Sequence, residues 1–255
     1  MTSSKAAVLL VALVIVIAIA AALFPATPQP QSYHHFADQR SWLGIPNFGD
    51  VASNLGFTIV GAWGLIALLR RGPGAISFTD PRERWFYELI FLGMFLTAFG
   101  SSYYHFAPDN ARLVWDRLPM TIVFMSLVAA VIAERVSVNA GVRLWPALLA
   151  TGIASVLVWR ASELRGNGDL RFYAAVQAGS ILILLLALFL PARYTRGSDF
   201  AVVVGFYVLA KILETADRKV FAIGQIVSGH TLKHLAAAAA GYWVLRMLER
   251  RKPIL

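Results

Sequence analysis

The sequence predicts an all-α polytopic membrane protein, with a seven-transmembrane-helix core preceded by an N-terminal signal-anchor helix. Hydrophobic residues make up 58% of the 255 residues and charged residues only 15%, which is too apolar for an ordinary soluble domain. Apolar runs of about 20 residues, the length of a membrane-spanning helix, recur along the chain. These runs lack the alternating pattern of membrane β-strands, so we expect helices throughout.

The first apolar run, residues 6–24, follows the basic residue Lys5 and precedes a polar segment, as in a signal sequence. Because the run is long enough to cross a membrane, we expect residues 1–24 to be a retained signal anchor. A cleaved signal peptide is the alternative. Residues 25–49 contain proline, glutamine and histidine and are expected to be an exposed connection. Residues 50–255 are expected to form the seven-helix core.

Seven further spans are expected in the core, and short loops join them. They cover approximately residues 50–69, 86–106, 113–134, 143–159, 172–190, 199–215 and 228–248. Glycine, proline and asparagine mark the loops, for example at residues 72–74 and 166–168. No internal repeat is visible, so we treat the core as one unit.

The basic residues favour one orientation of these spans. If Lys5 is cytoplasmic, loops on its side of the membrane contain more arginine and lysine than loops on the opposite side. The basic residues on the Lys5 side are Arg70, Arg71, Arg82, Arg84, Arg135, Arg143, Arg193, Arg196, Arg246, Arg250, Arg251 and Lys252. Membrane orientation therefore explains the net charge of +9 better than nucleic-acid binding does. The absence of cysteine excludes disulfides and thiolate chemistry.

Three of the five histidines lie where a metal ion could bind. His230 and His234 are four residues apart at the start of the last span, so on a helix they share a face, about 5.4 Å apart along the axis. His105 ends the second core span, on the same side of the membrane. Three histidines and a water form a known catalytic zinc set. For the pair His230 and His234 alone, interfacial histidines near lipid headgroups are the alternative interpretation.

Two further polar residues are expected at this face of the membrane. Ser101 lies four residues before His105, and Asp116 begins the next span. Amide hydrolysis needs a group that accepts and returns a proton, which Asp116 can do, and a donor to the oxyanion, which Ser101 can provide. The alternatives are an ion pair of Asp116 with Arg112 or Arg117, and a helix-packing role for Ser101.

Taken in order along the chain, these residues resemble the CREST superfamily of seven-helix membrane hydrolases, and within it the alkaline ceramidases. The matching set is Ser101-x-x-x-His105, Asp116 within residues 115–120, and His230-x-x-x-His234. Residues 47–55 also resemble the segment that opens the first core helix of the family, and the whole resemblance covers residues 36–248. It implies a zinc-dependent amidase that cleaves the N-acyl bond of ceramide-like lipids. The three histidines would be zinc ligands, and the aspartate and serine would have the roles given above.

The sequence departs from the family in one region. The alkaline ceramidases carry an acidic cluster ahead of the first core helix that binds calcium. Asp38 and Asp50 are present here, but Asn47 stands where the family has a glutamate, which leaves calcium in doubt as a cofactor. Asn54 in the same region either caps or packs its helix or lines the site, and both interpretations stay open.

Other polar residues near this face have simpler expectations. Lys211, Glu214 and Asp217 are spaced for local ion pairs, with hydrogen bonding to the zinc ligands as the alternative. His34 and His35 lie in the polar connection and are expected to be solvated.

The favoured function is a hydrolase that takes a ceramide-like lipid from the bilayer. We expect the protein to be integral to a bacterial inner membrane, with its site at the periplasmic face. A seven-helix lipid-binding receptor-like protein is the main alternative, and it would not need the set of Ser101, Asp116 and three histidines. A b-haem carrier is less favoured, because its axial histidines usually come from opposing helices.

Overall fold

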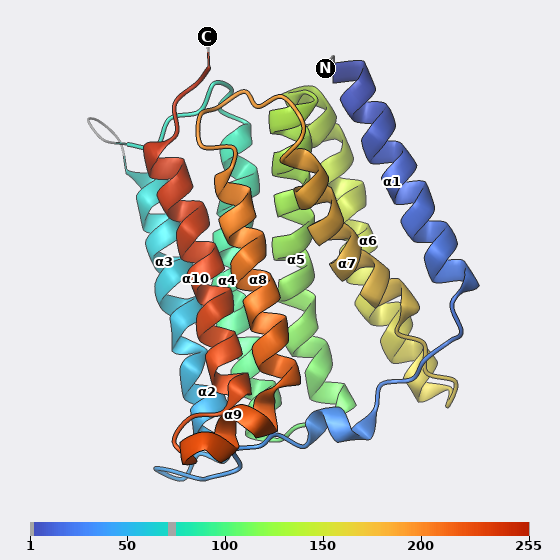
Figure 1. Ribbon diagram of the computed structural model, residues 1–255, viewed down its shortest axis with the longest axis vertical. Coiled ribbons are helices and arrows are strands. Elements are labelled where there is room, and N and C mark those ends of the chain that lie inside the picture. The colour runs from blue at the N-terminus through green and yellow to red at the C-terminus, as the bar shows by residue number, and fades with distance from the viewer. Residues whose placement is uncertain (1–2, 71–74, 255) are drawn as a thin grey trace.

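The computed structural model describes residues 3–70 and 75–254 (Figure 1). Within these two ranges the chain is helical and contains no β-strand, with isolated bridges only at Trp42–Ile45 and Tyr194–Pro253. The expected all-α fold class is therefore confirmed. The expected turn at residues 72–74 and the basic residue Arg71 lie outside the described residues.

The described ranges contain ten α-helices, and the long ones run up and down in alternation (Figure 1). They are α1 (Ser3–Leu23), α2 (Phe48–Ser53), α3 (Leu55–Leu69), α4 (Glu83–Phe106), α5 (Asn110–Arg135), α6 (Val138–Leu164), α7 (Arg171–Ala187), α8 (Asp199–Thr215), α9 (Asp217–Gly224) and α10 (Gly229–Arg250). A 3-10 helix, Gln31–His34, lies in the connection after α1. Both ends of the chain lie at the top of Figure 1, and the short helices α2 and α9 lie at the bottom.

Within the described residues, five segments are long and apolar enough to cross a membrane. They are Ser4–Leu23, Phe48–Leu69, Glu83–Phe106, Asn110–Arg135 and Val138–Leu164. These segments are consistent with an integral membrane protein. Helices α7 and α8 each have 17 residues, and the first turns of α10 are polar, which explains why these three do not meet the same criterion.

Capping residues explain why two helices begin earlier than the apolar pattern predicts. Asp109 accepts a hydrogen bond from the Arg112 backbone N–H at 2.7 Å at the start of α5. Ser137 accepts one from Ala140 at the start of α6, at 3.1 Å. Such side-chain acceptors satisfy N–H groups that have no partner in the first turn. The helices therefore extend over polar residues that hydropathy alone assigns to loops.

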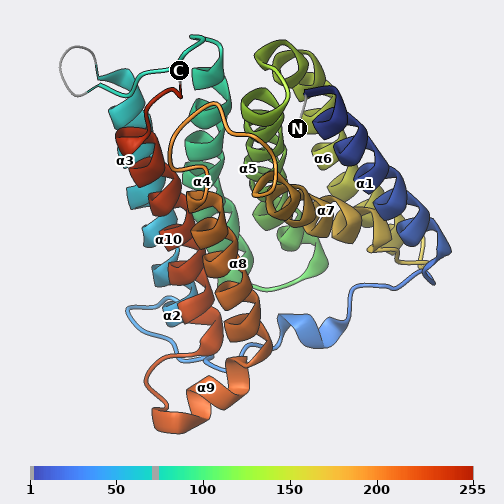
Figure 2. The ribbon, with the colours of Figure 1, turned by 45° about the horizontal axis from the view of Figure 1, so that its top comes forward.

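The core of the bundle lies between α3, α4, α5, α7, α8 and α10 (Figure 2). Its large side chains include Phe86 and Phe91 of α4, Leu184 of α7 and Leu245 of α10, all nearly or fully buried. A smaller cluster near the bottom of Figure 1 combines Phe36 from the connection with side chains of α4, α5, α6 and α7.

Helix α1 lies at the edge of the bundle and packs mainly on α7 (Figure 2). Most of its side chains are exposed, including Val8 and Val16, while Leu10 is buried. A membrane would cover such an apolar exposed surface. The role of this helix as a signal anchor stays a prediction.

The upper end of the bundle holds a buried group of charges. Arg251 Nη1 lies 3.3 Å from Glu134 Oε2, and it also donates to the Tyr87 hydroxyl at 3.1 Å. Arg135 Nη2 lies 3.3 Å from Glu134 Oε1. The sequence placed Arg135 and Arg251 beside the ends of their spans on the Lys5 side, and there both are buried and pair with the carboxylate of Glu134.

Candidate metal centre

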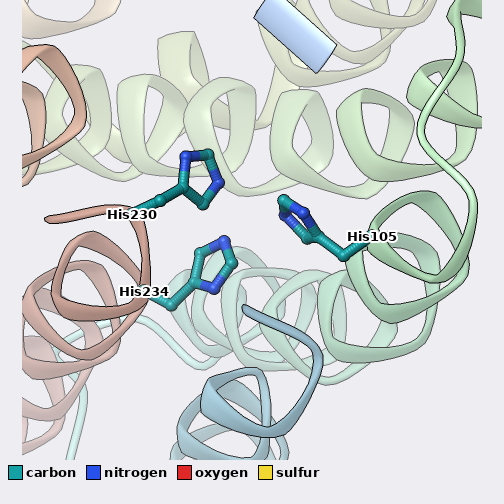
Figure 3. A group of neighbouring side chains, drawn as sticks. All are labelled: His105, His230 and His234. Atoms are coloured by element: carbon teal, nitrogen blue, oxygen red, sulfur yellow. The ribbon is translucent and has the colours of Figure 1, made fainter. Parts of the chain in front are cut away.

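Three histidines from two helices form one buried group (Figure 3). His105 lies in the last turn of α4, and His230 and His234 lie in the first turns of α10. Nitrogen atoms, one from each ring, lie within 4.8 Å of one another, and the ring centroids are 4.8–5.0 Å apart. Each histidine is at most 3% exposed. The group could therefore hold a metal ion.

The start of α10 is fixed by hydrogen bonds to polar residues around it. Ser228 caps the helix by accepting from the Thr231 N–H at 3.0 Å, and both hydroxyls donate to Asp50 Oδ1. A Cβ on Gly229 would lie 2.3 Å from the Leu213 carbonyl oxygen, so only glycine fits there. The two histidines of α10 are thereby held at a defined height in the bundle.

The other nitrogens of the histidines have different surroundings. The Ser53 hydroxyl donates to the Asp50 carbonyl at 3.1 Å and lies 2.8 Å from His234 Nδ1, so its oxygen can accept a hydrogen bond from a protonated Nδ1. That tautomer leaves His234 Nε2 free to bind a metal. His105 Nδ1 is buried and has no hydrogen-bond partner among the described residues. Buried polar atoms normally have a partner, and a metal ion would provide one.

Charges next to His230 are paired. Lys233 Nζ lies 3.1 Å from His230 Nε2 and 2.8 Å from Glu214 Oε1. Glu214 also forms an ion pair with Lys211 and accepts from the Tyr33 hydroxyl at 3.2 Å. The carboxylate therefore offsets the ammonium charge that would otherwise repel a metal ion.

Both interpretations of Lys211, Glu214 and Asp217 hold in part. The local ion pair of Lys211 and Glu214 is present. Asp217 Oδ1 also accepts from the His230 backbone N–H at 2.8 Å, and its Oδ2 accepts from the Ala37 N–H at 2.9 Å. These acidic residues therefore support the histidine group as well as their own helix.

Ser101 and Asp116 are buried and line the same cavity as His234. A Cβ on Gly100 would lie 2.0 Å from the Trp115 carbonyl oxygen, so the missing side chain lets α4 and α5 touch next to these two residues. Ser101 faces the Asp116 carboxylate across this contact.

The expected alternative for Asp116, an ion pair with a neighbouring arginine, is not found in the described part of the chain. Arg112 pairs with Asp109, and Arg117 Nη2 donates to Gln29 Oε1 at 2.6 Å. The Asp116 carboxylate therefore stays available to a molecule in the cavity.

The cavity is lined by His234 of the histidine group and extends into the apolar interior between α4, α5, α7, α8 and α10, with a volume of about 400 Å³. Polar side chains line one end, whereas the deeper part is apolar, with Ile90, Met94, Leu127, Leu184 and Val244. This volume is in the range of small-molecule sites, and the mixture of apolar walls with a few polar groups is typical of them.

The connection between α1 and α2 covers the histidine group instead of being exposed throughout. The centroid of the Phe36 ring lies 4.6 Å from that of His105 and 4.5 Å from that of His230, and Phe36 is 4% exposed. His34 is half-buried, with Nδ1 2.8 Å from the Tyr104 hydroxyl and Nε2 2.9 Å from Asn110 Oδ1. The expectation that His34 is solvated was wrong, because these partners replace water. His35 is exposed, as expected.

The residues considered for calcium are engaged with other protein groups. Arg40 donates to both oxygens of Asp38, and this hydrogen bonding lowers the pKa of the Asp38 carboxyl below its usual value. Asp50 accepts from the two hydroxyls at the start of α10 through Oδ1, whereas its buried Oδ2 has no hydrogen-bond partner among the described residues. Asn47 has the positive φ of 47° that asparagine tolerates, and its amide donates to the His105 carbonyl at 2.8 Å. It supports a histidine of the metal group.

Asn54 lies at the junction of α2 and α3, where its amide donates to the Asp50 carbonyl at 2.9 Å. It does not line the cavity described above. The structure therefore favours the packing interpretation of Asn54.

Several residues of the site were not recognised from the sequence. Lys233 lies between the two histidines of α10, and a charged residue in an apolar span was the available signal. Ser53 and Phe36 carry no such signal, because serine and phenylalanine are common in membrane helices and their contacts join segments far apart in the chain.

In comparisons with known proteins, no family model matches the chain and no curated protein matches it.

Proposed function

We propose that the chain is a zinc-dependent membrane amidohydrolase that cleaves the N-acyl bond of ceramide-like lipids. The observation that carries this proposal is the buried histidine group, of which His234 lines an apolar cavity that Ser101 and Asp116 also line. Each of these parts has a simpler explanation alone, but amide hydrolysis requires them together.

The donor set suits zinc. Three neutral imidazoles leave one position of a tetrahedral zinc ion open, which is the arrangement of catalytic and not of structural zinc sites. His105, His230 and His234 would hold the ion. Bound zinc lowers the pKa of a coordinated water to about 7 and polarises a carbonyl group.

The chain itself would move the protons. Asp116 accepts a proton from the attacking water and delivers it to the amine that leaves when the C–N bond breaks. Ser101 donates a hydrogen bond to the carbonyl oxygen as it gains negative charge. The products are a carboxylate and an amine, so oxygen and protons balance with one water consumed.

The deeper part of the cavity supports an acyl chain as the substrate portion bound there. Its walls are aliphatic, and each buried methylene group contributes about 0.8 kcal/mol. We further propose that α7, α8 and α10 cross the bilayer with α3–α6, which gives a seven-helix core. The metal centre would then lie near the periplasmic surface of a bacterial inner membrane, where lipids can enter from the bilayer.

The test is hydrolysis of a panel of N-acyl sphingoid lipids by purified protein, with added zinc and with chelator. Asp116→Asn keeps the size of the side chain but cannot take up a proton at neutral pH. It should retain zinc and lower turnover by about 10²–10⁴. Asp109→Asn, at the cap of the same helix, is the matched control and should keep turnover.

Two results would count against the proposal. Turnover close to that of the parent in zinc-loaded Asp116→Asn would remove this residue from the mechanism. If the zinc-loaded parent hydrolyses no lipid amide but binds these lipids, the receptor-like alternative is favoured.

A further inference from the structure

Arg117 of α5 is a buried cation at the wall of the cavity. It is 6% exposed, and its guanidinium carbon lies 4.2 Å from the Trp159 ring centroid and 4.5 Å from that of Tyr173. The same carbon lies 5.9 Å from the Tyr33 ring centroid. Nη2 donates to Gln29 Oε1 at 2.6 Å. Aromatic faces and an amide therefore fix the position of the guanidinium.

None of these partners carries a negative charge. Nη1 is buried and has no hydrogen-bond partner, and across residues 3–70 and 75–254 no carboxylate forms an ion pair with Arg117. By contrast, the buried Arg135 and Arg251 both pair with Glu134. A buried charge is costly unless it is paired, and cation–π contacts offset only part of that cost.

The unpaired charge faces the cavity. Arg117 lines the same cavity as Asp116 and His234. Its neighbours Gln29, Tyr33 and Tyr173 line this cavity as well. The nearby carboxylate of Glu163 is engaged elsewhere, since it accepts from the Gln29 N–H at 2.7 Å and from Trp159 Nε1 at 3.2 Å.

Among the described residues that line the cavity, the positively charged side chains outnumber the negatively charged ones by one. Lys211 and Lys233 both pair with Glu214. Asp116 is the other acidic residue of the lining, and it faces Ser101. A metal ion on the histidines would add further positive charge. The occupied cavity therefore favours a molecule that brings a negative group to Arg117.

We propose that Arg117 binds an oxyanion, a carboxylate or phosphate, carried by the lipid that fills the cavity. The planar guanidinium has donors spaced to match two oxygens of such a group, and Nη1 is the one left free. This inference deepens the proposed function by making acidic lipid amides its substrate class. The oxyanion has two possible sources, an acidic headgroup on the substrate or the carboxylate released by cleavage.

The primary test measures binding and not turnover, so that it does not depend on the hydrolase proposal. Full-length protein in phosphatidylcholine nanodiscs is treated with chelator, and binding of radiolabelled dodecyl phosphate, dodecanoate and dodecanol is compared. Charge-assisted hydrogen bonds predict that both anions bind on the order of 10- to 100-fold more tightly than the alcohol.

The variants separate loss of the charge from loss of the fold. Arg117→Gln should abolish the preference for anions. Gln29→Glu keeps the guanidinium and its aromatic contacts but gives it an internal carboxylate, so it should abolish the preference as well. Arg112→Gln removes a half-exposed arginine five residues earlier in α5 and should leave the preference unchanged. Equal binding of anions and alcohol by the parent, or an unchanged preference in Gln29→Glu, would overturn the proposal.

Hydrolysis by the zinc-loaded protein then identifies the source of the oxyanion. If the headgroup is bound, N-dodecanoylglycine is cleaved faster than N-dodecanoylethanolamine, and Gln29→Glu removes this difference. If the released carboxylate is bound, Gln29→Glu instead weakens inhibition by dodecanoate. Failure to cleave either amide would contradict the hydrolase proposal while leaving the binding result to decide the role of Arg117.

Discussion

The charge of Lys233 lies beside a proposed zinc ligand and must be balanced for a metal ion to bind. Glu214 provides this balance from α8, and Tyr33 hydrogen bonds to the same carboxylate. Groups that contact metal ligands in this way commonly change metal affinity when they are replaced. At the scale of single residues, the metal centre therefore includes Lys233 and Glu214 as well as the three histidines.

Replacing Glu214 by glutamine removes this balance while keeping the shape of the side chain. Glu214→Gln should lower zinc affinity by about 10- to 100-fold. Competition against a chromophoric chelator measures the change. Glu249→Gln, in the surface pair with Arg246 at the other end of α10, is the control and should bind zinc as the parent does. Equal zinc affinity in the two variants would show that Lys233 does not influence the metal.

The sequence predicted part of the site, and the physical reason is local spacing. His230 and His234 share a face because they are one helical turn apart, and His105 reaches them because helices alternate in direction. The contact of Ser53 with His234 joins residues 181 positions apart, and no local pattern marks it. The same holds for Gln29 beside Arg117, which are 88 residues apart.

At the scale of elements, buried charges hold together the end of the bundle opposite the histidines. Arg251 follows α10 and pairs with Glu134 of α5, while Arg135 donates to the Leu190 carbonyl at 3.0 Å after α7. Charge counting assigned these arginines to loops, because it identifies a basic residue but not the carboxylate that folds against it. The sequence also predicted the starts of α5 and α6 too late, because their capping residues, Asp109 and Ser137, lie outside the apolar runs.

Removing the shared carboxylate of this group should destabilise the fold. Glu134→Gln leaves the buried Arg135 without a paired charge and leaves Arg251 with only its longer contact to Glu83, at 3.9 Å, which costs about 3–5 kcal/mol. Unfolding in detergent measures the loss. Glu249→Gln breaks a solvent-exposed pair and should cost no more than about 1 kcal/mol. Similar stabilities for the two variants would contradict a structural role for the buried group.

For the whole molecule, the alternation of helices places both chain ends opposite the histidine group (Figure 1). The described helices lie close to the residue ranges that the apolar runs mark, because the polar breaks between these runs coincide with the ends of the helices. Which end faces the cytoplasm depends on the basic residues and stays a prediction. The sequence did not predict that the connection after α1 covers the histidine group. This connection is attached to the bundle by the buried side chain of Phe36 and by long-range hydrogen bonds, which no local pattern marks.

Single cysteines can test the orientation, because the chain has none. Ala111 and Asn167 are exposed at the histidine end, and Lys252 is exposed at the opposite end. In spheroplasts, an impermeant thiol reagent should label Ala111→Cys and Asn167→Cys, and should label Lys252→Cys only after lysis. The reverse pattern would place the histidine group at the cytoplasmic face.

The metal content of the purified protein tests the central claim most directly. Elemental analysis of the full chain should find about one zinc ion per molecule. The zinc should be lost in His105→Ala and in His234→Ala, because two histidines in an open site hold zinc poorly. It should be retained in His35→Ala, a histidine exposed in the connection. A protein that contains no transition metal after purification and zinc supplementation, or one that absorbs as haem, would contradict the account.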